Sequence, residues 1–442
     1  MNAGTNAESP IVRRLVLVVL ILNAFSSVLF ITAVKRPVYD DPNNLPDVHR
    51  YAREGVSPET IRLHRNPTGP ASFIWMAAAV RILGGDELRD ARIAALASWI
   101  ILGAAILLLA AKTSSPYLWY CALLVTLVFP HALTASATVL TEGPALLFAT
   151  LGSFLWLESI SELSPSPRRF LQGILGGLFM GIAITCRQYY LVLLPAAAVF
   201  AYFQWRQDRA AKNPRWSWMV LLSLLAATFL VALLLAIWKG ISSPGMATGT
   251  SYDHAWKATV GLNLSRPMIV AFYAAVYLVP FTFPAMFYLK ASQRRISMVI
   301  AVLGGVGIAY FSSLFLQPGP LSSLIRFASR LPHGGTVLFA LAAVAALYNA
   351  VAVGFLLWEQ REAISSNAPA VFSLLAILFF VAEQIGVGGN LPFYDRYVLQ
   401  LAPFLGIIAF SVLPRLTAPR LLALAGLSVL SHVMLWRFAF GG

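Results

Sequence analysis

The sequence predicts an all-α protein that crosses a membrane many times. Two observations lead to this fold class. The chain of 442 residues is 59% hydrophobic and only 11% charged, and its mean hydropathy of +0.75 lies far above the range of soluble proteins. Apolar runs of about 18 or more residues, the length at which a helix spans a bilayer, also recur along the whole chain.

The apolar runs predict about 13 membrane-spanning helices. The first run, residues 12–34, is too long for a signal peptide and lacks a small-residue cleavage site, so we expect it to remain as a span. No internal repeat and no low-complexity segment is found, which favours a single membrane domain over residues 1–442 without a soluble module. The other spans are expected at residues 92–111, 117–134, 143–160, 170–186, 189–205, 218–238, 267–289, 297–316, 335–358, 370–386, 396–413 and 421–438.

A long polar loop, residues 35–90, follows the first span and is expected to carry short helices. Residues 46–54 can form one of them. Residues 73–83 are apolar but too short to cross a bilayer, and Arg81 interrupts them. A helix that lies along the membrane surface fits this stretch better than a span.

Basic residues in the short loops predict the orientation. They gather on one side of the spans, which the positive-inside rule makes cytoplasmic. The N-terminus is then cytoplasmic, and the loop at 35–90 and the C-terminus are extracytoplasmic, in a bacterium outside the inner membrane. The basic residues on the cytoplasmic side are Arg13, Arg14, Arg168, Arg169, Arg206, Arg209, Lys212, Arg215, Lys290, Arg294, Arg295, Arg415 and Arg420.

The outer loop opens with "VYDDPNNLPDVHRYAREG", residues 38–55, which concentrates ionisable side chains just after the first span. An outward face rich in both aspartate and arginine favours a site that binds an anion and performs acid–base chemistry on it. The alternative is a long loop that simply escapes the charge rule.

Several motifs, in order along the chain, resemble the GT-C superfamily of polytopic glycosyltransferases. These are the acidic pair after the first span, "TEGPALLF" from Thr141, and "PFYDRYVLQLAPFL" at residues 392–405. The number of spans resembles the branch that modifies lipid A with aminoarabinose. The resemblance implies a GT-C-like fold.

The first loop is also similar to the dolichyl-phosphate-glucose α-1,2-glucosyltransferases. That family has an acidic pair, a proline, an Arg-Tyr and a glycine at nearly this spacing, and "CRQYYLVLLP" resembles its Arg-Gln segment. The sequence departs from the pattern at Asp41 and Asn44, where glutamate and histidine are usual. The matching positions are Asp40, Asp41, Pro46, Arg50, Tyr51, Gly55, Arg187 and Gln188.

These resemblances imply a hexosyl- or pentosyltransferase that moves a sugar from a polyprenyl-phosphate donor to a glycan or lipid-linked acceptor within the membrane lipid. The acceptor hydroxyl must lose a proton, and Asp40 or Asp41 can take it as general base. The leaving group is a phosphate, so no general acid is needed, but arginines are expected to bind it. The expected substrate-binding residues are Asp47, His49, Tyr51, His64, Arg65, Glu142, Arg187, Gln188, Arg326, Arg330, Tyr394, Arg396 and Tyr397.

Each candidate also has a structural interpretation. The aspartate pair can be solvated or cap a turn, and Asp47 and Glu142 can be acids that favour a helix N-terminus. Arg187 can be an interfacial anchor, and Arg396 can pair with its neighbour Asp395.

The sequence lacks an Asp-x-Asp motif, a zinc motif, a phosphate-binding glycine loop and a nucleic-acid motif. We therefore expect no metal, no other cofactor and no nucleic-acid partner. A transporter or flippase of a lipid-linked or small anionic substrate is the alternative. Such proteins usually keep their polar residues near the bilayer midplane and in repeated halves, whereas here those residues concentrate on one face.

Overall fold

The computed structural model describes residues 2–113, 115–161, 166–208, 214–245, 262–316, 319–386, 395–413 and 416–440. Throughout these ranges the chain forms helices joined by turns and loops, with no strand. The chain divides into two compact units, each assembled from separate stretches of sequence. Unit 1 comprises Met1–Arg14, Tyr117–His131 and Thr259–Ser431, and unit 2 comprises Leu15–Pro116, Ala132–Ala258 and His432–Gly442.

Helices account for all of the predicted spans. Eight are long and apolar enough to cross a membrane: α1 (Asn2–Ala33), α5 (Glu87–Leu109), α8 (Glu142–Ile160), α9 (Pro167–Cys186), α11 (Pro214–Trp238), α13 (Ser265–Thr282), α18 (Gly334–Glu359) and α22 (Ala418–Phe440). The remaining predicted spans overlap α6 (Pro116–Val128), α10 (Leu193–Asp208), α15 (Ala291–Tyr310), α20 (Ala368–Glu383) and α21 (Ala402–Val412). The prediction of an all-α, multi-pass membrane protein is confirmed.

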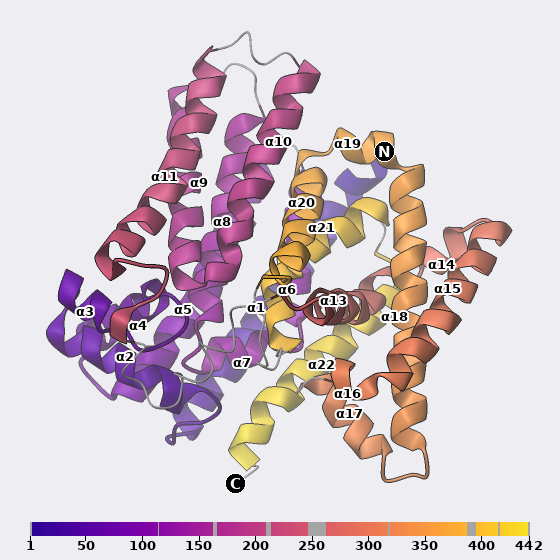
Figure 1. Ribbon diagram of the computed structural model, residues 1–442, viewed down its shortest axis with the longest axis horizontal. Coiled ribbons are helices and arrows are strands. Elements are labelled where there is room, and N and C mark those ends of the chain that lie inside the picture. Colours follow the sequence, from indigo (N-terminus) through magenta and orange to yellow (C-terminus); the bar gives the residue numbers. More distant parts are fainter. Residues whose placement is uncertain are drawn as a thin grey trace. The chain divides into compact units, whose positions relative to one another are not determined.

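In unit 2, α9 packs closely between α8 and α11 (Figure 1). Glycine makes this approach possible. A β-carbon on Gly177 of α9 would lie 2.0 Å from the carbonyl oxygen of Ser223 in α11. The side chain of Ser223 then accepts a hydrogen bond of 2.9 Å from Trp156 Nε1 of α8. Small residues let membrane helices approach each other, and the glycines of α9 permit this close packing.

The first polar loop is folded into α2 (Asp41–Glu54), α3 (Pro58–Arg62) and α4 (Ala71–Leu83). The helix expected from residue 46 begins five residues earlier, because Pro42 fits the first turn, where no backbone donor is required. Reciprocal hydrogen bonds between Ser57 and Thr60 start α3. Positive φ angles at Gly55 and Gly84 end α2 and α4.

Apolar packing holds these loop helices to the rest of unit 2. Phe73, Met76 and Val80 of α4 are buried against Val48 and Tyr51 of α2. Hydrogen bonds also hold the end of α3, because its carbonyl groups accept from side chains of α11 and of the segment after it. Trp238 Nε1 donates to the oxygen of Ile61 at 3.0 Å, and Ser243 Oγ donates to that of Arg62 at 2.7 Å.

Unit 2 also contains α7 (Ala132–Ala137) and two 3₁₀ helices, η1 (Ala110–Lys112) and η2 (Gln188–Val192). Unit 1 adds the short helices α14 (Ala285–Tyr288), α16 (Ser312–Phe315), α17 (Pro320–Ala328), α19 (Arg361–Ser365) and the 3₁₀ helix η5 (Asp395–Leu401). Within unit 1, α15 and α18 lie side by side (Figure 1). Arg420 of α22 is buried within unit 1, and its Nε donates to the carbonyl oxygen of Phe281 at 2.6 Å.

Candidate functional site in the first loop

The two adjacent aspartates at the start of α2 occupy different environments. Asp41 is completely buried, and both of its carboxylate oxygens have partners. Oδ2 lies 2.5 Å from Arg92 Nη2 of α5 and accepts from the backbone N–H of Val38 at 3.0 Å, while Oδ1 accepts from that of Val139 at 2.5 Å. Arg92 also donates to the carbonyl oxygens of Val34 and Arg36. Through these contacts, Asp41 and Arg92 connect the start of α2 to the residues after α1, to α5 and to the segment before α8.

Asp40 is half-buried instead. It stands at the N-cap position of α2, yet its side chain makes no capping hydrogen bond to the helix. The preceding residue, Tyr39, has a φ of 59°, a left-handed conformation that is uncommon for a bulky residue. Strained backbone of this kind is concentrated at functional sites. Of the two aspartates, Asp40 is therefore the more accessible to solvent.

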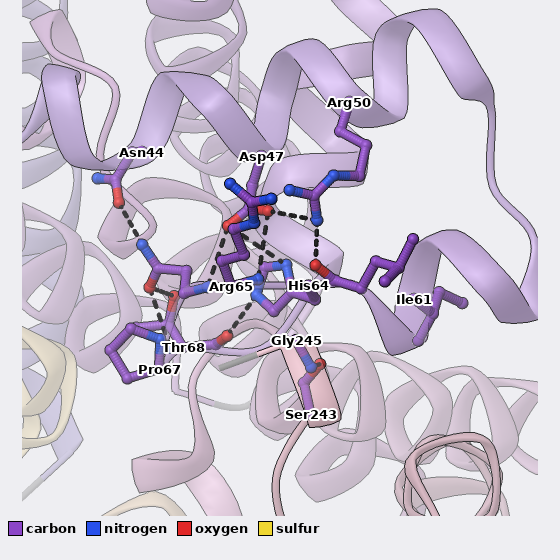
Figure 2. A network of polar contacts seen from close by, with 12 residues as sticks. Asn44, Asp47, Arg50, Ile61, His64, Arg65, Pro67, Thr68, Ser243 and Gly245 are labelled. Carbon is purple, nitrogen blue, oxygen red and sulfur yellow. Dashed lines mark hydrogen bonds and ion pairs between the residues drawn. The ribbon is translucent and has the colours of Figure 1, made fainter. Parts of the chain in front are cut away.

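Asp47, two turns into α2, organises the segment that follows α3 (Figure 2). Only 2% of the residue is exposed. Its Oδ2 accepts from the backbone N–H of Asn66 at 3.0 Å and its Oδ1 from that of Arg65 at 3.3 Å. Arg50 Nη1 lies 3.2 Å from Oδ1 and also donates to the carbonyl oxygen of Leu63. The carboxylate thereby shapes residues 63–66 from one side.

Side-chain amides continue this network on both sides of Asp47. Asn44 Nδ2 donates to the carbonyl oxygen of Val139 at 2.6 Å, and Asn44 Oδ1 accepts from Asn66 Nδ2 at 2.8 Å. Asn66 Oδ1 in turn accepts from both the N–H and the hydroxyl of Thr68, at 3.1 and 2.8 Å. Through these bonds the start of α2, the segment before α8 and residues 64–68 hold one another in place.

His64 is the buried centre of the segment. Its Nε2 lies 2.8 Å from the carbonyl oxygen of Thr68, and its ring packs between those of Tyr51 and Phe73 at centroid distances of 6.0 and 5.0 Å. Burial lowers the pKa of His64, and Arg50 lowers it further, against the opposing effects of Asp47 and the Thr68 carbonyl. Burial raises the pKa of Tyr51, because here too it disfavours the charged form, and the charge of Asp47 adds to this effect. Both rings are thus neutral at pH 7.

The segment docks onto the end of α9. The backbone N–H of Gly69 donates to the carbonyl oxygen of Cys186 at 3.1 Å, and Gln188 Nε2 donates to that of Pro67 at 3.2 Å. A β-carbon at residue 69 would lie 1.9 Å from the oxygen of Thr185, so only glycine permits this contact. The Arg-Gln segment and the loop that follows α3 are therefore neighbours.

Arg187 forms a buried ion pair with Glu142 at the start of α8. The Nη2–Oε1 distance is 2.7 Å, and only 5% and 1% of the two side chains are exposed. Arg187 Nε also donates to Thr141 Oγ1 at 2.8 Å, and the carbonyl oxygen of Thr141 accepts from Ser72 Oγ at 3.2 Å. The charge of Arg187 is thus balanced within the protein.

The remaining candidates of the loop lie nearer its surface. His49 Nε2 is 2.5 Å from Glu87 Oε2, and both side chains are about one-third exposed. Arg65 is exposed. Only its backbone N–H is held, and its guanidinium has no ion pair among the described residues. Arg65 is consequently an exposed cation whose backbone is held by Asp47.

The other predicted site residues belong to unit 1. Arg396, in η5, is 8% exposed, and its guanidinium lies 5.6 Å from the ring centroid of Tyr397. Arg326 ends α17 and is exposed, and Arg330 stacks on Phe327 at 5.1 Å. Tyr394 lies outside the described residues. Within unit 2 the structure brings together Asp47, His64, Arg187 and Gln188 through the segment at residues 64–69.

Sequence reasoning missed several residues of the network. Arg92 carried a usable signal, because an ionisable residue in an apolar span is a candidate for a structural or functional role by default. Asn44, Asn66 and Thr141 carried no such signal, since amides and hydroxyls are common in loops. Within the described ranges no group of three or more His, Cys, Asp or Glu side chains could hold a metal ion. The expectation of a metal-independent reaction remains a prediction.

Fold and site together define an integral, multi-pass membrane protein whose first long loop is folded around buried, hydrogen-bonded acids. No family model and no curated protein matches the sequence. Two crystal structures of ArnT from Cupriavidus metallidurans are among the similar solved structures. The one bound to undecaprenyl phosphate has a TM-score of 0.44 and 12% identity, over 94% of this chain and 77% of that one. The apo structure has a TM-score of 0.41 and 12% identity, over 96% and 77%. Likeness this low identifies no function, which has to be inferred from the contacts of the chain itself.

Proposed function

We propose that the chain is a membrane glycosyltransferase of the GT-C type, which moves a sugar from a polyprenyl-phosphate donor to a glycan or lipid-linked acceptor on the outer face of the membrane. One observation carries the proposal. Three separate segments that resemble glycosyltransferase motifs meet, through residues 64–72 of the first loop, in one continuous hydrogen-bond network. The segments are residues 38–55, 141–142 and 186–188.

The continuity of the network is what distinguishes it from four unrelated structural contacts. Asp47 and Asn44 hold residues 64–68, Gly69 bonds to Cys186, and Arg187 bonds to Thr141. Buried polar networks rigidify a structure and are costly when any member lacks a partner. A network of this size on a loop supports a positioning role for that loop.

Asp40 is the general base in this proposal. A base must reach the acceptor hydroxyl, and a positioned carboxylate contributes about 10²–10⁴-fold in rate. Asp41 is enclosed by Arg92 and two backbone donors, so its lone pairs are already occupied. Asp40 is half-buried and follows the strained residue Tyr39. In this proposal Asp41 positions the start of α2, and Asp40 takes the proton of the acceptor hydroxyl.

Arg65 is the candidate of unit 2 that best suits the donor phosphate. Arginine offers a permanent charge and bidentate hydrogen bonds to phosphate. Arg187 is buried and paired with Glu142, whereas Arg65 is exposed and its backbone is held by Asp47. Arg396 remains a second proposed phosphate ligand, since its stacking on Tyr397 orients the guanidinium.

A transfer assay tests the proposal. Purified full-length protein in vesicles is incubated with a panel of polyprenyl-phosphate sugars and with membrane glycolipid acceptors, and released polyprenyl phosphate and labelled product are measured. We expect turnover with at least one donor, a loss of about 10²-fold or more in Asp40→Asn, and no loss in Glu59→Gln, an exposed acid of the same loop. Passage of an intact lipid-linked or anionic substrate across the vesicle membrane, without any covalent transfer, would identify a transporter or flippase instead.

A further inference from the structure

A cavity of about 270 Å³ lies at the end of the unit 2 helices that is remote from the loop. It is formed where α5 and α8 end and α9 begins. Glu142 belongs to the loop network and Glu158, on the same helix, lines the cavity. These two residues are 16 positions apart on α8, which at 1.5 Å per residue is about 24 Å along the axis. The cavity is therefore separate from the proposed active site, and the basic short loops predict that its face is cytoplasmic.

The walls of the cavity have an apolar part and a basic part. Leu109, Phe154 and Leu155 supply apolar surface, and Lys112, Arg168 and Arg169 supply positive charge. This arrangement of apolar surface beside cations matches an amphiphile with an anionic head.

Among the described residues that line the cavity, cations outnumber acids. Glu158 is the one acid in the lining, and it is engaged by Arg169: the Oε2–Nη1 distance is 3.6 Å, and Nη1 also donates to the carbonyl oxygen of Glu158. Lys112 and Arg168 have no ion pair within the described part of the chain. The described lining therefore has one negative and three positive side chains, a net charge of +2.

The start of α9 adds to this imbalance. Its first turn contains two arginines and no acid, although a helix N-terminus already carries a partial positive charge and favours anions. Ser166 caps the helix by accepting from the backbone N–H of Arg169 at 3.4 Å. A ligand with negative charge would relieve the repulsion between the arginines and the helix dipole.

Gln172 gives a second indication of a ligand. Gln172 lines the cavity, and its Oε1 is shielded from solvent and accepts no hydrogen bond from the described residues. A buried acceptor without a donor is unfavourable, and a hydroxyl on the ligand would satisfy it.

We propose that this cavity binds the headgroup of an anionic phospholipid of the inner leaflet. Lys112 and Arg168 bind its phosphate, Gln172 accepts from a headgroup hydroxyl, and Leu109 and Phe154 contact the start of an acyl chain. The site is independent of the proposed transferase activity, so either can fail without the other. The positive-inside rule alone also accounts for basic residues here, and the experiment separates a formed site from a diffuse basic face.

Binding is measured with the purified, delipidated full-length chain in neutral detergent, titrated with dioctanoyl phosphatidylglycerol, dioctanoyl phosphatidylcholine or glycerol 3-phosphate. We expect saturable binding of one phosphatidylglycerol, and affinities for the other two probes that are lower by about 10-fold or more. Each interfacial cation contributes about fivefold to the attraction of an anionic lipid, so Lys112→Gln/Arg168→Gln should weaken binding about 30-fold.

Two further variants identify the cavity as the site. Thr113→Phe fills the cavity without changing a charge, and should abolish saturable binding. If that variant does not fold, Leu155→Trp fills the same space. Arg14→Gln/Arg295→Gln removes two exposed cations that lie outside the cavity on the predicted cytoplasmic side, and should bind as the wild type does.

Three results would overturn the proposal. Equal losses in the Lys112/Arg168 and Arg14/Arg295 variants would indicate attraction to the basic face as a whole. Unchanged binding in both cavity-filling variants would exclude the cavity. Glycerol 3-phosphate that competes as well as the lipid would assign the site to a soluble phosphate.

Discussion

Asparagine substitutions at Asp40 and Asp41 should separate catalysis from stability. We expect Asp40→Asn to fold normally and lose turnover, and Asp41→Asn to lose stability first. The difference follows from their surroundings, because the side chains of Asp41 and Arg92 are both 0% exposed and 2.5 Å apart, whereas Asp40 is half-buried.

The expected size of the Asp41 effect can be worked out from its partners. Its carboxylate accepts from Arg92 and from the N–H groups of Val38 and Val139. An asparagine has one acceptor oxygen, so its NH₂ group must face at least one of these donors. Removing one partner of a buried ion pair typically costs about 3–5 kcal/mol, because the other charge stays buried. Substitution of the half-buried Asp40, which is not enclosed as Asp41 is, should cost less than about 1 kcal/mol.

Both quantities are measured on the same preparations. Unfolding in mixed micelles gives the free energy of unfolding, and the transfer assay gives turnover at saturating donor. The Asp40 variant should lose about 10²-fold or more in turnover with nearly unchanged stability. An Asp41 variant that unfolds like the wild type yet is inactive would refute this assignment, and would make Asp41 the proton acceptor.

Three further predictions concern the segment after α3 and the phosphate. Gly69→Ala should separate this segment from Thr185, whose oxygen would lie 1.9 Å from the new β-carbon. Limited proteolysis should detect faster cleavage there but not in Gly307→Ala, where no atom lies within 4 Å. Burial lowers the pKa of His64 in the folded state. Below the ordinary histidine pKa of about 6.5, the unfolded chain therefore binds a proton at His64 more readily than the folded chain does. The contribution of His64 to stability should therefore be complete above about pH 7 and be lost as the pH falls. The difference in melting temperature between the wild type and His64→Gln should change with pH in the same way. A difference that stays constant with pH would contradict the prediction. Arg396→Ala should lose about 10–150-fold in donor affinity or turnover, the value of a charge-assisted hydrogen bond, and Arg396→Lys should lose less. Equal donor titrations for all three proteins would remove Arg396 from the site.

The long apolar runs made the fold class predictable, because spanning length and composition are local properties of the sequence. The same logic identified residues 73–83 as too short to span, and they lie within the 13-residue helix α4. Helix starts were less accurate. The turn at Asp40 depends on Tyr39 adopting a positive φ, which no local pattern announces. Extracytoplasmic placement of the loop remains a prediction from the charge rule.

The sequence motifs identified the segments that form the site, but they did not show what each residue contacts. Asp40 and Asp41 are adjacent and chemically identical in the sequence. Their difference in burial comes from Arg92, 51 residues away, which reaches Asp41 only after α5 packs against the start of α2. Asp47 was expected as a first-turn helix acid or a substrate ligand. In the structure it holds the backbone of residues 65 and 66, a contact that depends on tertiary packing.

The docking of Gly69 on Cys186 also has a consequence for biogenesis. The loop emerges early in synthesis, but the residues that complete it, 185–188, follow more than 110 positions later. Long-range contacts of this kind form late and leave the intervening chain exposed while it waits. A nascent chain halted after α8 should therefore present residues 64–70 to proteases, and a chain extended through α9 and η2 should protect them. The protein would complete this loop only once the fifth of its predicted spans has been inserted.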